Sequence, residues 1–132
     1  MRAVDTNLLV RALVRDDAAQ SAAAEAVLAN EPVFIPVTVM LELEWVLRSR
    51  YGFEPNKLSQ AFTLLCALPN VTVGEAAAVR QAAARLAKGW DFADALHHAL
   101  SEGCVDFLSF DDHLVKRAAR ASPRALPPIR KP

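Results

Sequence analysis

Two kinds of apolar pattern alternate along the chain and predict its secondary structure. Short apolar runs predict strands at residues 2–4, 33–35, 71–73 and 106–110. Longer segments with apolar residues three and four positions apart predict helices at residues 7–14, 17–30, 39–50, 56–67, 75–88, 91–102 and 112–121. Thr38 is the expected N-cap of the third helix. Strands that alternate with helices predict an α/β fold, in which helices cover both faces of a parallel sheet.

The chain is expected to form a single domain over residues 1–132, because no repeat and no Gly-, Ser- or Pro-rich linker divides it. Of its 132 residues, 53% are hydrophobic and 23% are charged, which is typical of a compact globular protein and excludes a disordered chain. Residues 122–132 are expected to form a C-terminal tail rich in proline and arginine.

Three features predict a cytoplasmic protein. The N-terminus lacks the apolar segment of a signal peptide. The longest uncharged stretch, residues 58–74, contains Pro69 and Asn70 and is too polar for a membrane span. The two cysteines, Cys66 and Cys104, have neither the density of a disulfide framework nor the spacing of a zinc site, so we expect reduced thiols.

The net charge of zero hides an uneven distribution of charges. Residues 1–112 contain all 15 acidic residues and nine of the 15 basic residues, a balance of −6. Residues 113–132 contain no acid and a balance of +6, from Lys116, Arg117, Arg120, Arg124, Arg130 and Lys131. These cations are candidates for contacts with the phosphates of a nucleic acid, and the alternative is a solvated basic helix and tail.

Two acidic residues directly follow predicted strands. Asp5 comes after the first strand and Asp111 after the last. Ligands of open α/β sheets bind outside the carboxyl ends of the strands, so both residues are candidates for a site. Asp5 is also suited to cap the following helix, although Thr6 and Asn7 could cap it instead. Asp112 is the expected cap of the last helix.

Glu42 is expected to lie in the apolar stripe of the helix at residues 39–50. Its neighbours three and four positions away are Thr38, Val39, Trp45 and Val46. A carboxylate in such a stripe is costly without a cationic partner, so its presence suggests a function. Glu44, in contrast, has Arg48 four residues later, which predicts a solvated ion pair.

Asp91 and Asp94 lie three residues apart in the first turn of the helix at residues 91–102. Asp91 could cap this helix, and Asp94 could interact favourably with the helix dipole. Asp94 lies among small and apolar residues, which suggests that it points inward toward the strand ends. His98 could face the same site, and a buried or surface position is the alternative for it and for His97.

Four carboxylates that converge at one edge of a sheet repel one another unless a cation lies among them. The converging residues would be Asp5, Glu42, Asp94 and Asp111. This set offers only oxygen ligands, which favours Mg²⁺ or Mn²⁺ over zinc. In phosphate chemistry such ions orient the ester and lower the pKa of a bound water.

The order of these motifs resembles that of the PIN-domain ribonucleases. The matching segments are Val4-Asp5-Thr6-Asn7, Leu41-Glu42-Leu43-Glu44-Trp45-Val46-Leu47, Asp91-Phe92-Ala93-Asp94-Ala95-Leu96 and Ser109-Phe110-Asp111. Each motif is short, but four in this order over the whole chain make a specific match. The length and motif order are most similar to the VapC-type toxins of type II toxin–antitoxin pairs.

The resemblance implies a PIN-like three-layer α/β/α sandwich with a short central parallel sheet of four to five strands. It also implies an endoribonuclease that depends on Mg²⁺ or Mn²⁺ and cleaves RNA with a metal-activated water. The implied catalytic and metal-binding residues are Asp5, Glu42, Asp94 and Asp111, with Asp91 as an auxiliary metal ligand and Thr6, Asn7 and Ser109 in support. Ser109 stands where the family usually has threonine. The implied partners are the RNA substrate, a cognate antitoxin protein and a second copy of the chain in a homodimer.

Three other functions are alternatives to a ribonuclease. A receiver-like signalling module needs a phosphoacceptor Asp after a middle strand and a Lys after a late strand, and the chain has neither. An acid-using phosphohydrolase needs Asp-x-Asp, whereas Asp5 is followed by Thr6 and Asn7. A PIN-like domain that binds without catalysis is the third alternative, and the four acids argue against it.

Overall fold

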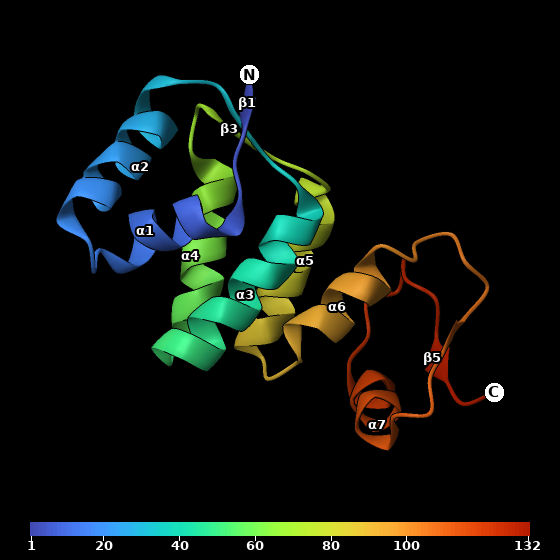
Figure 1. The fold of residues 1–132 in the computed structure, drawn as a ribbon. Coiled ribbons are helices and arrows are strands. Elements are labelled where there is room, and N and C mark those ends of the chain that lie inside the picture. Colours follow the sequence, from blue (N-terminus) through green and yellow to red (C-terminus); the bar gives the residue numbers. More distant parts are fainter.

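The computed structural model describes residues 1–132 and contains seven helices and five strands (Figure 1). The helices are α1 (Thr6–Val14), α2 (Ala18–Asn30), α3 (Val37–Tyr51), α4 (Pro55–Ala67), α5 (Ala76–Ala87), α6 (Phe92–Ala99) and α7 (Asp112–Arg120). The strands are β1 (Arg2–Ala3), β2 (Val33–Ile35), β3 (Val71–Val73), β4 (Phe107–Leu108) and β5 (Ile129–Arg130). The predicted mixed α/β class is confirmed, with helix predominant. None of the helices combines the length and apolar character that crossing a membrane requires.

All five strands run parallel to their partners, but they form two sheets. One sheet has the order β1-β2-β3, and the other consists of β4 and β5. The parallel direction of the strands is confirmed, but the expected single central sheet of four to five strands is divided into a three-stranded and a two-stranded sheet. The residues predicted as a tail contribute β5, because the backbone of Ile129 and Arg130 pairs with β4. β1, β3, β4 and β5 each have one strand partner and therefore one unpaired edge.

A contiguous hydrophobic core joins the helices to the sheets. α4 packs along α5, and α5 packs along α6. Phe62 of α4 and Phe92 of α6 are both buried and meet edge to face, with ring centroids 5.1 Å apart. This contact fixes the N-terminal turn of α6, which carries Asp91 and Asp94.

Residues 105–132, here named the C-terminal unit, contain β4, α7 and β5 and stand apart from β1 (Figure 1). The unit is anchored on α6 by His98, which is fully buried. Nε2 of His98 lies 2.7 Å from the carbonyl oxygen of Pro127, and its ring meets the Phe107 ring edge to face at 5.7 Å. Three further residues of the unit belong to the common core: Leu114, Ala118 and Ile129.

The buried histidine has a buried arginine as its other partner. Nη1 of Arg85 lies 2.9 Å from Nδ1 of His98. Because a guanidinium group can only donate, Nδ1 accepts and Nε2 carries the proton that it donates to Pro127. Burial lowers the pKa of His98, and the nearby charge of Arg85 lowers it further against the opposing effect of the Pro127 hydrogen bond. The alternative of a buried histidine is therefore confirmed for His98.

α3 differs from the predicted helix in its start and in its buried face. It begins at Val37 after Pro36, and Thr38 does not cap it. Its buried residues are Met40, Leu43, Glu44 and Leu47. Glu44 is therefore not solvated: it is 3% exposed, with Nε of Arg48 2.9 Å from its carboxylate. Glu42 lies on the exposed side instead of in the apolar stripe. Apolar residues surround this helix, so their spacing does not define one face.

The helix caps are partly as predicted. Asp5 caps α1, because its Oδ1 accepts a hydrogen bond from the backbone N–H of Leu8 at 3.0 Å. α7 is capped by Asp111 and not by Asp112, which forms an ion pair with Lys131. α6 ends at Ala99, before the predicted end at residue 102. The structure thus uses both candidate acids at strand ends as caps.

Candidate active site

Asp5 and Glu42 line one pocket of about 360 Å³ between α1 and α3, here named the first acid pocket. Thr6 joins the two helices, because its buried hydroxyl donates a hydrogen bond to Oε1 of Glu42. Asn7 also lines this pocket. The predicted supporting positions of Thr6 and Asn7 are thus beside the two acids. Arg11 and Arg50 line the same pocket, and the sequence did not indicate either of them.

Asp91, Asp94 and Asp111 line a different pocket of about 280 Å³, here named the second acid pocket. Oδ1 of Asp91 caps α6 by accepting the backbone N–H of Asp94 at 2.9 Å. Oδ1 of Asp111 accepts the backbone N–H of His113 at 2.9 Å. The backbone N–H of Asp111 in turn donates to the Ser109 hydroxyl at 3.0 Å. Ser109 therefore holds the turn that presents Asp111.

Asp94 is the acid most affected by its surroundings. Its side chain is half-buried, and burial raises its pKa above the ordinary value for aspartate. The negative charges of Asp91 and Asp111 raise the pKa further, and the charge of His97 opposes them. Asp94 therefore lies within the electrostatic reach of both other acids.

The structure does not bring the predicted acids together at one point. Asp5 and Glu42 lie in the first acid pocket, and the three other acids lie in the second. The all-oxygen donor set suits Mg²⁺ or Mn²⁺ chemically. However, no three His, Cys, Asp or Glu side chains of the chain lie in an arrangement that could hold a metal ion. The arrangement of one chain therefore does not fit the metal site that the resemblance implies.

A basic groove of about 290 Å³ adjoins the second acid pocket. Its basic side chains come from the end of α5 and from α7: Lys88, His113, Lys116, Arg117 and Arg120. Trp90, His113 and Arg117 line both the groove and the acid pocket. The Arg117 guanidinium lies over Gly89, where φ is +97° and a side chain would crowd it. The sequence gave no sign of this contact, which joins residues distant in the chain.

Five of the six lysines and arginines at residues 113–132 divide into two groups in the structure, and the sixth, Arg124, is exposed. Arg130 pairs with Asp106 at 2.7 Å, and Lys131 pairs with Asp112. Lys116, Arg117 and Arg120 form no such ion pair and face the basic groove. The charge available to an anionic ligand is therefore concentrated on α7, beside the second acid pocket.

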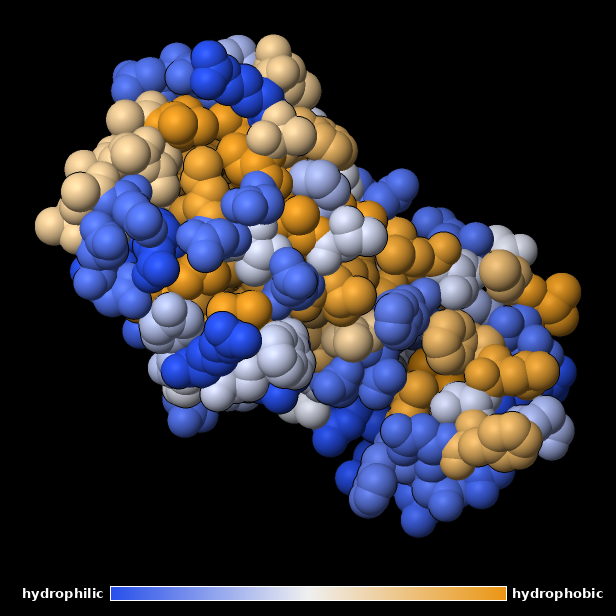
Figure 2. All heavy atoms as spheres, viewed as in Figure 1, coloured by the Kyte–Doolittle hydropathy of each residue, from blue (hydrophilic) through white to orange (hydrophobic).

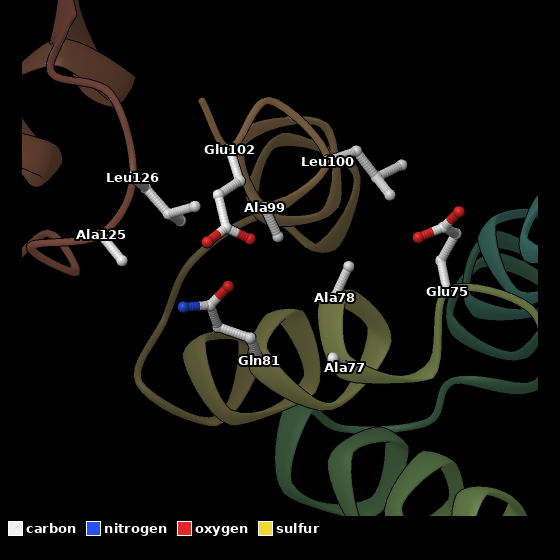
Figure 3. A pocket seen from close by; sticks show the side chains of 9 residues that line it. All are labelled: Glu75, Ala77, Ala78, Gln81, Ala99, Leu100, Glu102, Ala125 and Leu126. Carbon is white, nitrogen blue, oxygen red and sulfur yellow. The ribbon is translucent and has the colours of Figure 1, made fainter. Parts of the chain in front are cut away.

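The most voluminous of the five main pockets lies elsewhere, between α5, α6 and residues 125–126 (Figure 3). It has a volume of about 550 Å³, and none of the predicted site residues lines it. Gln81 and Glu102 approach each other in its middle, and Glu75 stands at one end (Figure 3). Its other lining residues are alanine and leucine, which offer no group for catalysis.

Comparison with known proteins identifies the family. Residues 2–121 match the PIN domain, so the chain belongs to the PIN domain family. The match spans both acid pockets and the basic groove. PIN domains are generally nucleases. No curated protein and no solved structure matches the chain.

Proposed function

We propose that this PIN domain is a metal-dependent endoribonuclease that cleaves single-stranded or loop RNA. Its catalytic acids are Asp5, Glu42, Asp94 and Asp111, with Asp91 as an auxiliary acid. One observation carries the proposal: the second acid pocket and the basic groove share a border at Trp90, His113 and Arg117. A nuclease that uses carboxylates needs this combination, because its substrate is a polyanion that the carboxylates by themselves repel.

The basic groove has the positive charge expected of a binding site for the phosphate backbone of an RNA strand. Proteins that bind single-stranded nucleic acid without strict sequence preference use a positively charged groove along the backbone. An acidic pocket by itself repels a phosphodiester. Arg117 stands at the border, where its charge can hold a phosphate within reach of Asp94 and Asp111. The support for metal dependence is the chemistry of the proposed acids, which offer only oxygen ligands and therefore suit Mg²⁺ or Mn²⁺.

The experiment that tests the proposal is cleavage of an RNA stem-loop with and without EDTA. We expect cleavage in the loop with Mg²⁺ or Mn²⁺, loss of cleavage in EDTA and recovery when excess Mn²⁺ is restored. This pattern also separates the protein from contaminating ribonucleases that need no metal. Equal cleavage with and without EDTA would contradict the proposed mechanism.

We further propose that the protein is the toxin of a type II pair. The support is the order of the four acidic motifs along the chain. If this is correct, the product of a neighbouring reading frame, co-expressed with the chain, is expected to co-purify with it and to inhibit RNA cleavage. Removal of that protein should restore cleavage. A neighbour that neither binds nor inhibits would count against the toxin and leave the nuclease proposal standing.

A further inference from the structure

We propose that the first acid pocket binds a nucleotide of the RNA substrate, whose base stacks on Trp45 and whose phosphate is held by Arg50. The inference deepens the proposed ribonuclease function and rests on it for the identity of the ligand. The motivating observation is that these two side chains line the same pocket as Asp5 and Glu42, two of the proposed catalytic residues. The pocket thus combines an aromatic ring, a cation and two carboxylates.

Trp45 is the tryptophan whose ring is available to a ligand. It is 52% exposed on α3, and the aromatic and cation–π contacts within the chain all involve other rings. Trp90, the other tryptophan, is 5% exposed, lies 4.6 Å from the Arg85 guanidinium and stacks with His98. Proteins bind single-stranded nucleic acid by stacking bases on aromatic side chains, because every base has a π-face. The free ring of Trp45 is therefore suited to a base.

Arg50 is the cation of the pocket that is available to an anion. It is exposed near the end of α3 and forms no ion pair within the chain. Arg11, the other arginine of the pocket, is already occupied, because its guanidinium lies 2.8 Å from Asp16 and 2.7 Å from Gln20. A guanidinium group binds phosphate through paired N–H donors. We therefore expect a phosphate in this pocket to bind at Arg50.

The order of these residues along α3 places the nucleotide beside the acids. Trp45 follows Glu42 by three residues, and Arg50 follows Glu42 by eight. A helix rises 1.5 Å per residue, so Glu42 and Arg50 are separated by about 12 Å along the axis of α3. The Thr6 hydroxyl holds the Glu42 carboxylate at the N-terminal turn of α1, next to Asp5. An RNA strand with one phosphate on Arg50 and one base on Trp45 therefore extends toward both carboxylates.

The surroundings of Trp45 favour a nucleotide over an apolar protein surface as the ligand. Tyr51 is the only other large hydrophobic side chain of α1 and α3 that is exposed, and its hydroxyl donates to Asp16 at 3.4 Å. The other exposed residues of the pocket are polar or charged: Asp5, Asn7, Glu42 and Arg50. Figure 2 shows apolar atoms interrupted by hydrophilic ones over the larger lobe, which carries α1 and α3 in Figure 1. The core of a protein–protein interface is instead depleted of charged residues.

Tryptophan fluorescence tests the stacked base directly. The probe is a single-stranded RNA hexamer, titrated in EDTA so that binding is measured without cleavage. A base stacked on the indole should quench the fluorescence of the wild type. Trp45→Phe leaves Trp90 as the only tryptophan, so the quenching should disappear, whereas a dye-labelled hexamer should still bind because phenylalanine also stacks with bases. Equal quenching in the two proteins would assign the signal to Trp90 and overturn the proposal.

Trp45→Leu separates base stacking from a general apolar contact. Leucine keeps an apolar side chain but has no ring, so the Kd for the labelled hexamer should rise roughly 5- to 150-fold. Trp45→Phe is the matched control and should stay within a few-fold of the wild type. If Trp45→Leu binds the hexamer as tightly as the wild type, the stacked base is wrong. An altered oligomeric state of that variant on gel filtration, with unchanged RNA affinity, would assign Trp45 to a protein contact instead.

Arg50→Gln tests the phosphate contact through its salt dependence. Its Kd, read from Trp45 quenching, should rise, and the slope of log K against log salt should become smaller by about 0.7, the value for one contact with a single strand. Arg2→Gln is the control, because Arg2 is exposed and lines neither the first acid pocket nor the basic groove. It removes the same charge and should leave the slope unchanged. An unchanged slope in Arg50→Gln would overturn the phosphate contact.

RNA cleavage separates a failure of this inference from a failure of the proposed function. Both Trp45→Leu and Arg50→Gln are expected to raise KM for a loop RNA. If the wild type cleaves RNA and both variants match its kcat/KM, the nucleotide site is wrong and the nuclease proposal stands. If the wild type neither binds nor cleaves RNA, both proposals are wrong.

Discussion

Asp5→Asn is expected to lower the rate of RNA cleavage by roughly 10²- to 10⁴-fold, the range typical for loss of a group that acts on the reacting atoms. The reason is loss of the negative charge at the carboxyl end of β1. The fold should be preserved, because the asparagine side-chain oxygen can still cap α1 by accepting the hydrogen bond from the Leu8 N–H. The measurement is the initial rate on a loop RNA at saturating Mn²⁺, with the unfolding midpoint determined for the same preparation.

Asp17→Asn is the matched control for this substitution. Asp17 caps α2 as Asp5 caps α1, and its Oδ1 lies 3.0 Å from the backbone N–H of Gln20. Both variants therefore replace a capping carboxylate with a capping amide, and both should have nearly wild-type stability. Only Asp5→Asn should lose activity. If the two variants cleave RNA at the same rate, Asp5 is a cap without a catalytic role.

The secondary structure could be predicted largely from local patterns. The apolar runs at residues 33–35 and 71–73 are flanked by turn-forming residues, and both are strands of the first sheet. β5 was missed because it contains only Ile129 and Arg130, which lie between prolines and a basic residue. It is a strand because its backbone pairs with β4, and a local pattern does not show this pairing. The division into two sheets depends on which edges meet, and strand patterns do not specify this.

Side-chain environments were predicted less well than elements. Glu42 was expected in the apolar stripe and is exposed, whereas Glu44 was expected in solvent and is buried. Apolar residues lie on all sides of α3, so the helices that pack against it determine which side is buried. The favourable spacing of Glu44 and Arg48 predicted their ion pair correctly, but did not show that the carboxylate is buried. A helix spacing identifies possible partners, and only tertiary packing decides which of them lose contact with water.

The candidate site shows the same limit at longer range. Sequence order placed Asp5 and Asp111 after strands, and the structure confirms both positions. Their expected convergence depended on a single sheet, and the strands instead form two sheets. A buried His98 was one of the alternatives from sequence, but its contacts with Arg85 and Pro127 could not be predicted, because they join α5, α6 and the C-terminal unit. The separation of the acids into two pockets therefore follows from tertiary packing, which local sequence patterns do not specify.

Phe62→Ala is expected to lower the free energy of unfolding by about 3–5 kcal/mol, a large part of the roughly 5–15 kcal/mol of an ordinary domain. Phe62 is fully buried, and its loss leaves a cavity against the ring of Phe92, which supports the turn that carries Asp94. Leu64→Ala on the same helix is the control, because Leu64 is 56% exposed, and its replacement should change stability by less than about 1 kcal/mol. Urea unfolding measures both. Similar losses for the two variants would show that α4 does not pack on α6 through Phe62, and would remove the structural support assigned to Asp94.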